Sequence, residues 1–420
     1  MLLVWGAQSL FGGRSGSSVL GWVLTTQVIA WAGWLWIFRS PSLPFPHIAW
    51  SLAFRGVAAL SAPLLEDDWA RYLWDGWRFI ESGSPYGVAP LAFFQDPTVP
   101  ELLQNRLSEI NHPNLPTIYG PTFQLGFGIA AWIAPGALWP WKLMVLAADI
   151  GTLFLLRSTA GPRAAVLYGW CPLAIQESVV NVHADILAIL PLVAAWHACQ
   201  RNRWILAGIF LGIAASGKPF ALVALPFFLG LRHRRGWAAA FVTFLALHAP
   251  FWMQERTATS LMTFAQDWEF NSSLVAVLGV FLPPSWARAV PLAAALPIVL
   301  VLWLRHSRSR EHPPLHLAYG TLFLASAVVN PWYLLWMLPF ASASPSLTPW
   351  VAMAAVSLSY ATALNLGVTG PGPYSHPAWV RPMEYGLILA AALAEYLQKR
   401  NRGADPATPD STPPTVQPIG

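Results

Sequence analysis

The sequence is poor in charged residues. Only 10% of its 420 residues are Asp, Glu, Lys or Arg, whereas a soluble domain usually carries about 25%. Hydrophobic residues make up 55% of the chain. Because this composition leaves too little polar surface for an ordinary soluble domain, it predicts an integral membrane protein that crosses the bilayer many times.

Lysine and cysteine are also scarce. Three of the 24 basic residues are lysine, namely Lys142, Lys218 and Lys399, and no basic run alternates with aromatic residues. The net charge of +5 therefore gives no indication of a nucleic-acid partner. The two cysteines, Cys171 and Cys199, have neither metal-ligand spacing nor a disulfide framework, and we interpret them as small core residues.

Basic residues are sparse in one long polar segment. The segment 66–118 has eight acidic residues and three arginines, whereas basic clusters begin at Arg157, Arg201, Arg232 and Arg305. The positive-inside rule makes those clusters cytoplasmic, which predicts that the loop 66–118 lies at the outer face.

The outer loop and the tail have further local signals. Segments 69–82 and 101–110 of the loop predict short interfacial helices, and Gly83-Ser84-Pro85-Tyr86-Gly87 predicts a turn. The last residues, 403–420, are rich in Pro, Thr, Ser and Asp, which predicts a disordered tail. We therefore expect one transmembrane domain over 1–402.

Apolar segments occupy most of the remaining chain. A spanning helix needs about 20 apolar residues, and several segments are shorter. Segment 205–229 is interrupted at Ser216-Gly217-Lys218-Pro219, which predicts two half-length helices. The fold is thus predicted to be an all-α, polytopic membrane helix bundle of about 11–13 spans. The apolar segments are 19–38, 48–65, 119–134, 138–156, 164–175, 180–198, 205–229, 238–253, 287–304, 315–329, 332–343, 350–366 and 385–397.

The path from the outer loop to His183 contains a conflict. Three apolar segments, 119–134, 138–156 and 164–175, separate the two. If each of them crossed the membrane, His183 would lie on the face opposite the loop. Either one segment is re-entrant or the number of crossings is different, and the sequence leaves both explanations open.

The densest group of charges directly follows segment 48–65. Four carboxylates and one arginine fall within the stretch 66–77. The adjacent Asp67 and Asp68 suit a general base whose pKa is raised by the neighbouring charge, or ligands of a divalent cation. The structural alternative is that Asp68 caps a helix that begins at Trp69.

Other polar residues of the loop have two interpretations each. Arg71 and Asp75 share a helix face with Asp68, so they suit either substrate binding or a surface ladder of ion pairs. His112 lies near the proline-rich end of the loop. It is a candidate hydrogen-bond partner of a substrate, although a lone histidine in a loop more often has no such role.

Ionisable residues also lie within the apolar segments. His183 and Asp185 are at the start of 180–198, and such residues at membrane depth are functional hypotheses, with interhelical hydrogen bonding as the alternative. Two residues apart on a helix, they point to different faces. We interpret Arg55 and Asp149 as a structural pair.

Three residues in the second half of the chain suit ligand binding. Lys218, at the break in 205–229, offers a point charge for a phosphate, or else it snorkels to the membrane surface. Trp332 and Tyr333 join two apolar segments. They form either an aromatic belt or the wall of a site for a sugar ring or a lipid headgroup.

Together these motifs resemble the GT-C superfamily of integral-membrane glycosyltransferases, especially the bacterial mannosyltransferase type that uses polyprenyl-phosphate sugars. The resemblance runs to about residue 339, and its first motif is the most specific. The chain departs from the family pattern at Ser84, where Asn is frequent, and at Gly120, where a second Pro is frequent. The motifs are Asp67-Asp68-Trp69-Ala70-Arg71-Tyr72-Leu73-Trp74-Asp75-Gly76, Gly83-Ser84-Pro85-Tyr86, His112-Pro113, Thr117-Ile118-Tyr119-Gly120-Pro121, His183-Ala184-Asp185, Gly217-Lys218-Pro219 and Asn330-Pro331-Trp332-Tyr333.

The resemblance implies transfer of mannose or another hexose from a polyprenyl-phosphate donor, with inversion, to a hydroxyl of a glycan or lipid acceptor at the outer face. It implies a loop aspartate as general base, a position that both Asp67 and Asp68 match. Nothing in the sequence calls for a particular cofactor, and a divalent cation is possible. The substrate-binding residues that it indicates are Arg71, Tyr72, Asp75, His112, Tyr119, His183, Asp185, Lys218, Trp332 and Tyr333.

A multi-span secondary transporter is the alternative from another functional class. It would share the broken helices and the buried charges, but transporters usually have repeated halves, and the sequence shows no internal repeat. The expected location of an enzyme of the resembled type is the bacterial inner membrane. The sequence does not identify the sugar, the acceptor or a metal requirement.

Overall fold

Helices form the described fold. The computed structural model describes residues 16–40, 46–63, 65–252, 256–309, 311–362 and 376–404. Within these ranges there is no strand, and Phe270 and Val328 form an isolated bridge, so the all-α prediction is confirmed. The α-helices are α2 (Gly16–Arg39), α3 (Pro46–Ala59), α4 (Asp68–Ser82), α5 (Glu101–Leu107), α6 (Pro121–Ile133), α7 (Leu138–Gly169), α8 (Pro172–Ala174), α9 (Asp185–Gln200), α10 (Trp204–Gly217), α11 (Ala224–Leu229), α12 (Arg234–His248), α13 (Arg256–Asp267), α14 (Leu274–Gly279), α15 (Pro284–His306), α16 (Leu315–Ala325), α17 (Leu338–Ser342), α18 (Thr348–Ala355) and α19 (Val380–Ala404). Shorter 3₁₀ and π turns are η1 (Pro90–Phe93), η2 (Ile175–Val180), η3 (Pro219–Val223), η4 (Ala249–Phe251), η5 (Pro331–Trp336) and η6 (Val356–Thr362).

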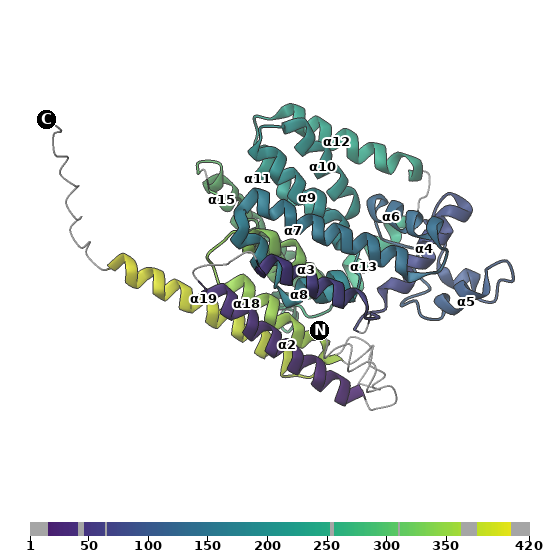
Figure 1. Cartoon of the computed structure of the whole chain (residues 1–420), viewed down its shortest axis with the longest axis horizontal. Coiled ribbons are helices and arrows are strands. Elements are labelled where there is room, and N and C mark those ends of the chain that lie inside the picture. Colours follow the sequence, from purple (N-terminus) through teal and green to yellow (C-terminus); the bar gives the residue numbers. More distant parts are fainter. Residues whose placement is uncertain are drawn as a thin grey trace.

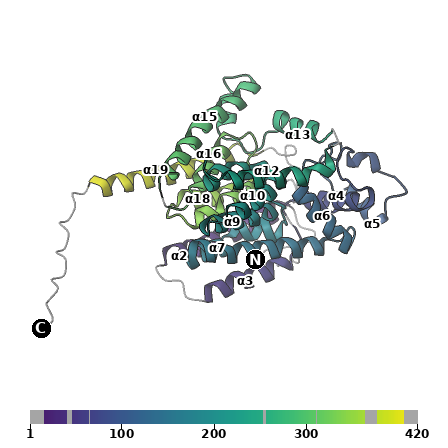
Figure 2. The ribbon, with the colours of Figure 1, turned by 90° about the horizontal axis from the view of Figure 1, so that it is seen from above.

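Helix α9 lies at the centre of the bundle. It packs against α7 and α10, and α10 in turn packs against α12 (Figure 1). Most side chains of α9 are buried, as expected for a helix that is apolar on all its faces. Helices α15 and α19 lie at the edge of the bundle (Figure 2).

Helix lengths give a first measure of the predicted spans. In the described part of the chain, α7 and α15 are the helices long and apolar enough to cross a membrane. Helix α15 buries Ala287, Pro291 and Ala295, which are spaced by four, and leaves large apolar residues of its other faces exposed. The remaining apolar helices are shorter, so the count of about 11–13 spans stays a prediction. The predicted tail lies outside the described residues from 405 onward, whereas Gly403 and Ala404 end α19.

The chain reverses direction inside α7. Gly161 has φ 91° and ψ 172°, a backbone conformation that glycine adopts without steric cost. A straight helix would separate Asp149 and Tyr168 by about 28 Å, yet the Tyr168 hydroxyl donates a hydrogen bond to the Asp149 carboxylate. Residues 138–160 and 162–169 therefore run in opposite directions and pack against each other. This agrees with the two separate apolar segments of the sequence.

Helix α6 does not cross the bundle, and this resolves the conflict over His183. With 13 residues it is only about 20 Å long, and it packs along α4. Thr122 at its start donates a hydrogen bond to the Ile213 carbonyl oxygen, and Gly136 just past its end lies beside Leu102 of the outer loop. Both ends thus lie near that loop, and only the two passes 138–160 and 162–180 remain, so His183 returns to the same end of the bundle.

A buried ion pair connects α3 to α7. The Arg55 guanidinium contacts the Asp149 carboxylate, and neither side chain is exposed. Arg55 also donates hydrogen bonds to the carbonyl oxygens of Ser51 and Gly169. The interpretation of Arg55 and Asp149 as a structural pair is therefore confirmed.

Candidate active site

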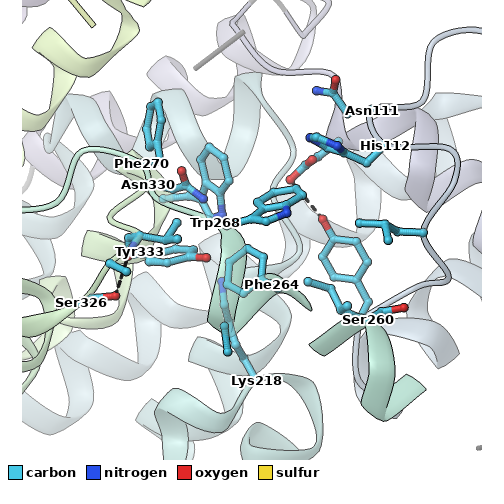
Figure 3. Close-up of a pocket in the computed structure, with 18 of the residues that line it drawn as sticks. Asn111, His112, Lys218, Ser260, Phe264, Trp268, Phe270, Ser326, Asn330 and Tyr333 are labelled. Atoms are coloured by element: carbon cyan, nitrogen blue, oxygen red, sulfur yellow. Dashed lines mark hydrogen bonds between the residues drawn. The ribbon is translucent and has the colours of Figure 1, made fainter. Parts of the chain in front are cut away.

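A cavity of about 740 Å³ lies where the outer loop meets the bundle. Its walls come from the loop, from the break after α10, from α13 and the residues that follow it, and from the start of η5 (Figure 3). These segments are far apart in the sequence, so only the folded chain creates this space. The predicted site residues that line it are Asp68, Arg71, His112, Tyr119, Lys218, Trp332 and Tyr333.

Helix α4 brings Asp68 to the cavity. The helix begins at Asp68 itself, and Asp67 is its N-cap residue but makes no capping hydrogen bond with its side chain. The acidic pair thus lies at the N-terminus of a helix, as the structural alternative expected, but Asp68 is the first residue of that helix and does not cap it. Ala70, Trp74 and Trp77 form one buried face of α4 and pack against the remainder of the loop, which fixes the direction in which Asp68 points.

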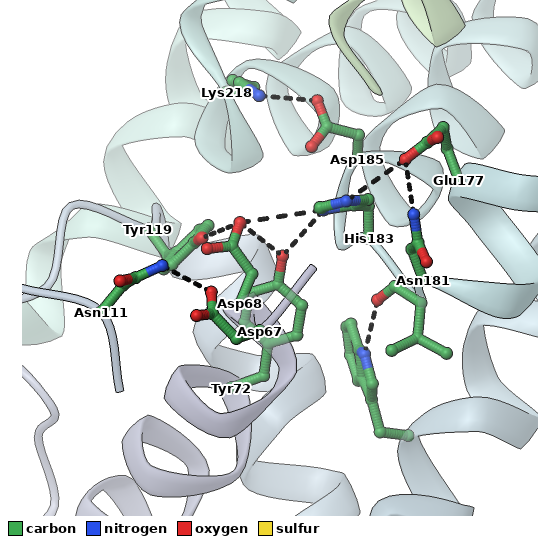
Figure 4. Close-up of polar contacts among 12 residues, drawn as sticks. Asp67, Asp68, Tyr72, Asn111, Tyr119, Glu177, Asn181, His183, Asp185 and Lys218 are labelled. Carbon is green, nitrogen blue, oxygen red and sulfur yellow. Dashed lines mark hydrogen bonds and ion pairs between the residues drawn. The ribbon is translucent and has the colours of Figure 1, made fainter. Parts of the chain in front are cut away.

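Several polar groups surround the Asp68 carboxylate. Its Oδ2 atom accepts hydrogen bonds from the hydroxyls of Tyr119, at 3.1 Å, and Tyr72, at 3.5 Å (Figure 4). The Nδ1 atom of His183 lies 3.8 Å from the same oxygen. Since the Asp68 side chain is 24% exposed, it is accessible from the cavity while it is held from behind.

Asp67 points elsewhere. Its Oδ1 atom accepts a hydrogen bond of 2.6 Å from the Asn111 amide (Figure 4), and Asp67 does not line the cavity. Burial, together with the neighbouring charge of Asp68, raises the pKa of Asp67 to about 7. The pKa of Asp68 is also raised, chiefly by burial. Burial thus contributes more than the like charge that the sequence suggested.

His183 lies behind the cavity wall. Its side chain is fully buried, its Nε2 atom is 3.4 Å from the Glu177 carboxylate, and its ring stacks on Trp332 at 4.0 Å. Glu177 accepts further hydrogen bonds from Asn181 and Tyr360. His183 therefore lies between Glu177 and Asp68 in a buried chain of polar groups.

Lys218 sits at the break predicted from the sequence. Its backbone is extended, with φ −149° and ψ 136°, between α10 and η3. Its ammonium group contacts the Asp185 carboxylate at 2.7 Å and lies 4.1 Å from the centre of the Tyr333 ring. The Trp336 indole also donates a hydrogen bond to Asp185. Lys218 also lines the cavity, and this paired position differs from that of a lysine that snorkels to the membrane surface.

A close approach brings the loop and the break together. A Cβ atom on Gly120 would lie 2.2 Å from the carbonyl oxygen of Ser216, so only glycine permits this contact. The neighbouring Tyr119 is consequently held next to the break that carries Lys218. The departure from the resembled family at Gly120 thus has a structural reason in this chain.

Arg71 and Asp75 form a pair inside the protein. The Arg71 Nε atom is 2.8 Å from Asp75, and its two terminal nitrogens are each 3.1 Å from the Leu115 carbonyl oxygen. Asp75 is 1% exposed and accepts a hydrogen bond from Gln124. The alternative of a surface ladder is therefore wrong, because this pair anchors the end of the loop to α4.

The structure separates the predicted residues into two groups. Those that do not line the cavity lie directly behind residues that do, and direct contact with a substrate is therefore not supported for them. Asp185 forms an ion pair with Lys218. Tyr72 donates a hydrogen bond to Asp68, and His183 lies close to the same carboxylate. The predicted residues without cavity surface are Asp67, Tyr72, Asp75, His183 and Asp185.

One wall of the cavity was missed from the sequence. Ser260 and Phe264 of α13, and Trp268 just after it, line the cavity (Figure 3), and the Trp268 ring lies 4.3 Å from His112. Arg288 of α15 also lines the cavity and donates a hydrogen bond to the Trp268 carbonyl oxygen. The spacing by four of 260, 264 and 268 in a segment too polar to span was the available signal.

The polar residues do not assemble an evident metal centre. Across the ranges that the structure describes, no group of three or more His, Cys, Asp or Glu side chains is arranged to hold a metal ion. The divalent cation that the adjacent aspartates suggested stays a prediction.

Comparison with known proteins gives a family. The family model described as Glycosyltransferase family 87 matches residues 117–331. The matched part begins at the end of the outer loop and contains Tyr119, His183 and Lys218. A search of curated proteins found no match.

Proposed function

The chain belongs to glycosyltransferase family 87, a GT-C family of membrane glycosyltransferases, and from this premise we propose that it transfers a hexose, such as mannose, from a polyprenyl phosphate to an acceptor hydroxyl. It is an enzyme, and the alternative of a secondary transporter is set aside. The observation that supports the proposal most is that a carboxylate, Asp68, and a cation, Lys218, line one cavity.

Asp68 is the general base of the proposed reaction. The acceptor oxygen attacks the anomeric carbon, its proton passes to the Asp68 carboxylate, and the bond from that carbon to the lipid phosphate breaks. The bonding electrons leave with the phosphate, and the anomeric centre is inverted. Asp68 suits this role better than Asp67 because it is the one of the two that lines the cavity. Burial raises the pKa of both carboxyls, so the choice between them rests on position.

Lys218 stabilises the negative charge that develops on the departing lipid phosphate. Arg71 suits this role less well, because its Nε atom and both terminal nitrogens already donate to Asp75 and Leu115. The Lys218 ammonium is paired with Asp185, but it has three donors and so retains others for a phosphate. The donor sugar then lies against Trp332 and Tyr333, and the acceptor lies toward His112 and Trp268. Aromatic rings offer flat faces to sugar rings on both sides of Asp68.

The proposed setting is the bacterial inner membrane, crossed several times, with the loop 66–118 at the outer face. The donor enters from the bilayer, and the acceptor is a glycan or a lipid. Helix α15 supports lateral entry because Arg288 and Leu292 line the cavity while apolar residues further along the helix are exposed. Residues 1–402 form one domain in this proposal, and the tail is separate from it.

A donor screen tests the proposed function. Purified protein is incubated with a panel of polyprenyl-phosphate hexoses and candidate acceptors, and the released lipid phosphate is measured together with the glycosylated product. We expect release from at least one lipid donor and none from sugar nucleotides. Transfer from a sugar nucleotide alone would refute the proposed donor class.

Replacing Lys218 tests its role in donor binding. In Lys218→Met we expect kcat/KM for the lipid donor to fall about 10- to 100-fold, the size of a hydrogen bond to a charged group, with an unchanged KM for the acceptor. Lys218→Arg retains the charge and should recover part of the loss.

The control for this prediction is Lys399→Met, because Lys399 is exposed near the end of α19. An increase in the acceptor KM with unaltered donor kinetics in Lys218→Met would contradict the assignment of Lys218 to the donor phosphate.

A further inference from the structure

The two oxygens of the Asp68 carboxylate have different surroundings. Oδ2 accepts the hydroxyl hydrogen bonds of Tyr119 and Tyr72, and His183 approaches the same atom. In the described part of the chain, Oδ1 makes no hydrogen bond. In Figure 4 the dashed lines from these three partners meet at one oxygen of the carboxylate. The Asp68 side chain is 24% exposed, so solvent already offers hydrogen bonds to its carboxylate. The carboxylate therefore does not need the two tyrosine hydroxyls merely to replace lost hydration.

We propose that Tyr72 and Tyr119 are positioning residues, which hold Asp68 by its Oδ2 atom and leave Oδ1 to take the proton of the acceptor hydroxyl. This inference rests on the proposed function and deepens it, because it assigns the proton to one atom. The acceptor O–H bond breaks, its proton binds Oδ1, and the electron pair of that bond forms the new glycosidic bond.

The hydroxyl of Tyr72 is fixed by its ring. The ring stacks on Phe127 at 4.6 Å with an angle of 9° between the planes, and Trp141 meets it edge-on at 5.5 Å. The hydroxyl lies 3.4 Å from the Nδ1 atom of His183 as well as 3.5 Å from Asp68. Because a carboxylate is a stronger acceptor than a neutral imidazole, the single hydroxyl proton of Tyr72 is directed to Asp68.

Tyr119 is fixed through its backbone. The Tyr86 hydroxyl donates a hydrogen bond of 2.8 Å to the Tyr119 carbonyl oxygen, and the next residue, Gly120, is pressed against Ser216. The turn at 83–87 thus reaches the catalytic carboxylate through Tyr119. This gives a role to a motif that the proposed chemistry alone left unexplained.

The electrostatic surroundings of Asp68 agree with this assignment. Burial raises the pKa of Asp68, whereas the hydrogen bonds from Tyr119 and Tyr72 and the charge of Lys218 lower it. Asp185 on α9 raises it, Glu66 and Asp67 precede it in the chain, and His183 faces it from the loop before α9. Among these groups, the two tyrosines can be replaced by phenylalanine, so that their effect on the pKa of Asp68 is lost while the formal charge of the site stays the same.

The experiment compares Tyr119→Phe, Tyr72→Phe and Tyr385→Phe across pH, with the full-length enzyme and its lipid donor. We expect kcat to fall about tenfold in Tyr119→Phe, as for one hydrogen bond to a charged group, and less in Tyr72→Phe, because its contact is longer. In both, the acid limb of the pH profile should move to higher pH, since a lost donor destabilises the ionised carboxylate. Tyr385→Phe removes a hydroxyl bonded to the Asn271 carbonyl oxygen and should leave the profile unchanged.

A second measurement separates this inference from the proposed reaction. Infrared difference spectra of wild type against Asp68→Asn give the titration of the Asp68 carboxyl without any turnover. An upward shift of that titration in both tyrosine variants supports the inference even if no lipid donor is found. A lower kcat with an unmoved pH profile and an unmoved carboxyl titration would overturn it, because the tyrosines would then have only a structural role.

Discussion

Asp68→Asn should lose about 10²- to 10⁴-fold in kcat, the contribution of a general base. Asparagine has nearly the same shape and can still accept the hydroxyl hydrogen bonds of Tyr72 and Tyr119, but it cannot take a proton. The effect should therefore be on catalysis and not on folding. The measurement is the rate of sugar transfer at saturating donor and acceptor.

The matched control is Asp67→Asn. Asp67 makes a hydrogen bond with Asn111 and does not line the cavity, so we expect it to keep activity within about tenfold of wild type. Equal losses in the two variants would contradict the choice of Asp68. Retention of transfer in Asp68→Asn would remove the general-base mechanism altogether.

Arg55→Met should lower the free energy of unfolding by about 3–5 kcal/mol, as when one partner of a buried ion pair is removed. The Asp149 charge would remain buried, with the Tyr168 hydroxyl as its remaining hydrogen-bond donor. The same change also removes the hydrogen bond to Ser51 within α3 and the hydrogen bond to Gly169, which joins α3 to the reversed part of α7. Denaturation in mixed detergent micelles measures this loss.

Two further variants make the stability result specific. Arg157→Met changes an exposed arginine on the same helix as Asp149 and should shift the free energy of unfolding by less than about 0.5 kcal/mol. The double variant Arg55→Met with Asp149→Leu leaves no unpaired charge and should recover part of the loss. A single-variant effect as small as that of Arg157→Met would show that the pair is not stabilising.

The sequence by itself determined the features that depend on neighbouring residues. Low charge and long apolar segments predicted an all-α membrane protein, and the charged stretch 66–77 indicated the candidate site. The helix predicted over 69–82 agrees with α4, the turn at Gly83 has φ 74°, and the break at Lys218 is present. Periodicity, turn residues and proline act over a few residues, so they can be read without knowledge of the fold.

Only the tertiary structure decided the features that depend on distant contacts. Asp67 and Asp68 are the same residue type at adjacent positions, and the packing of α4 alone determines which one lines the cavity. The apolar composition of α6 resembles that of a spanning helix, but its contacts with α4 and Leu102 keep it beside the loop. Trp268 joined the site through α13, whose sequence has no strong motif. Side-chain direction and chain reversal depend on packing between segments far apart in the sequence, and local sequence patterns do not encode that packing.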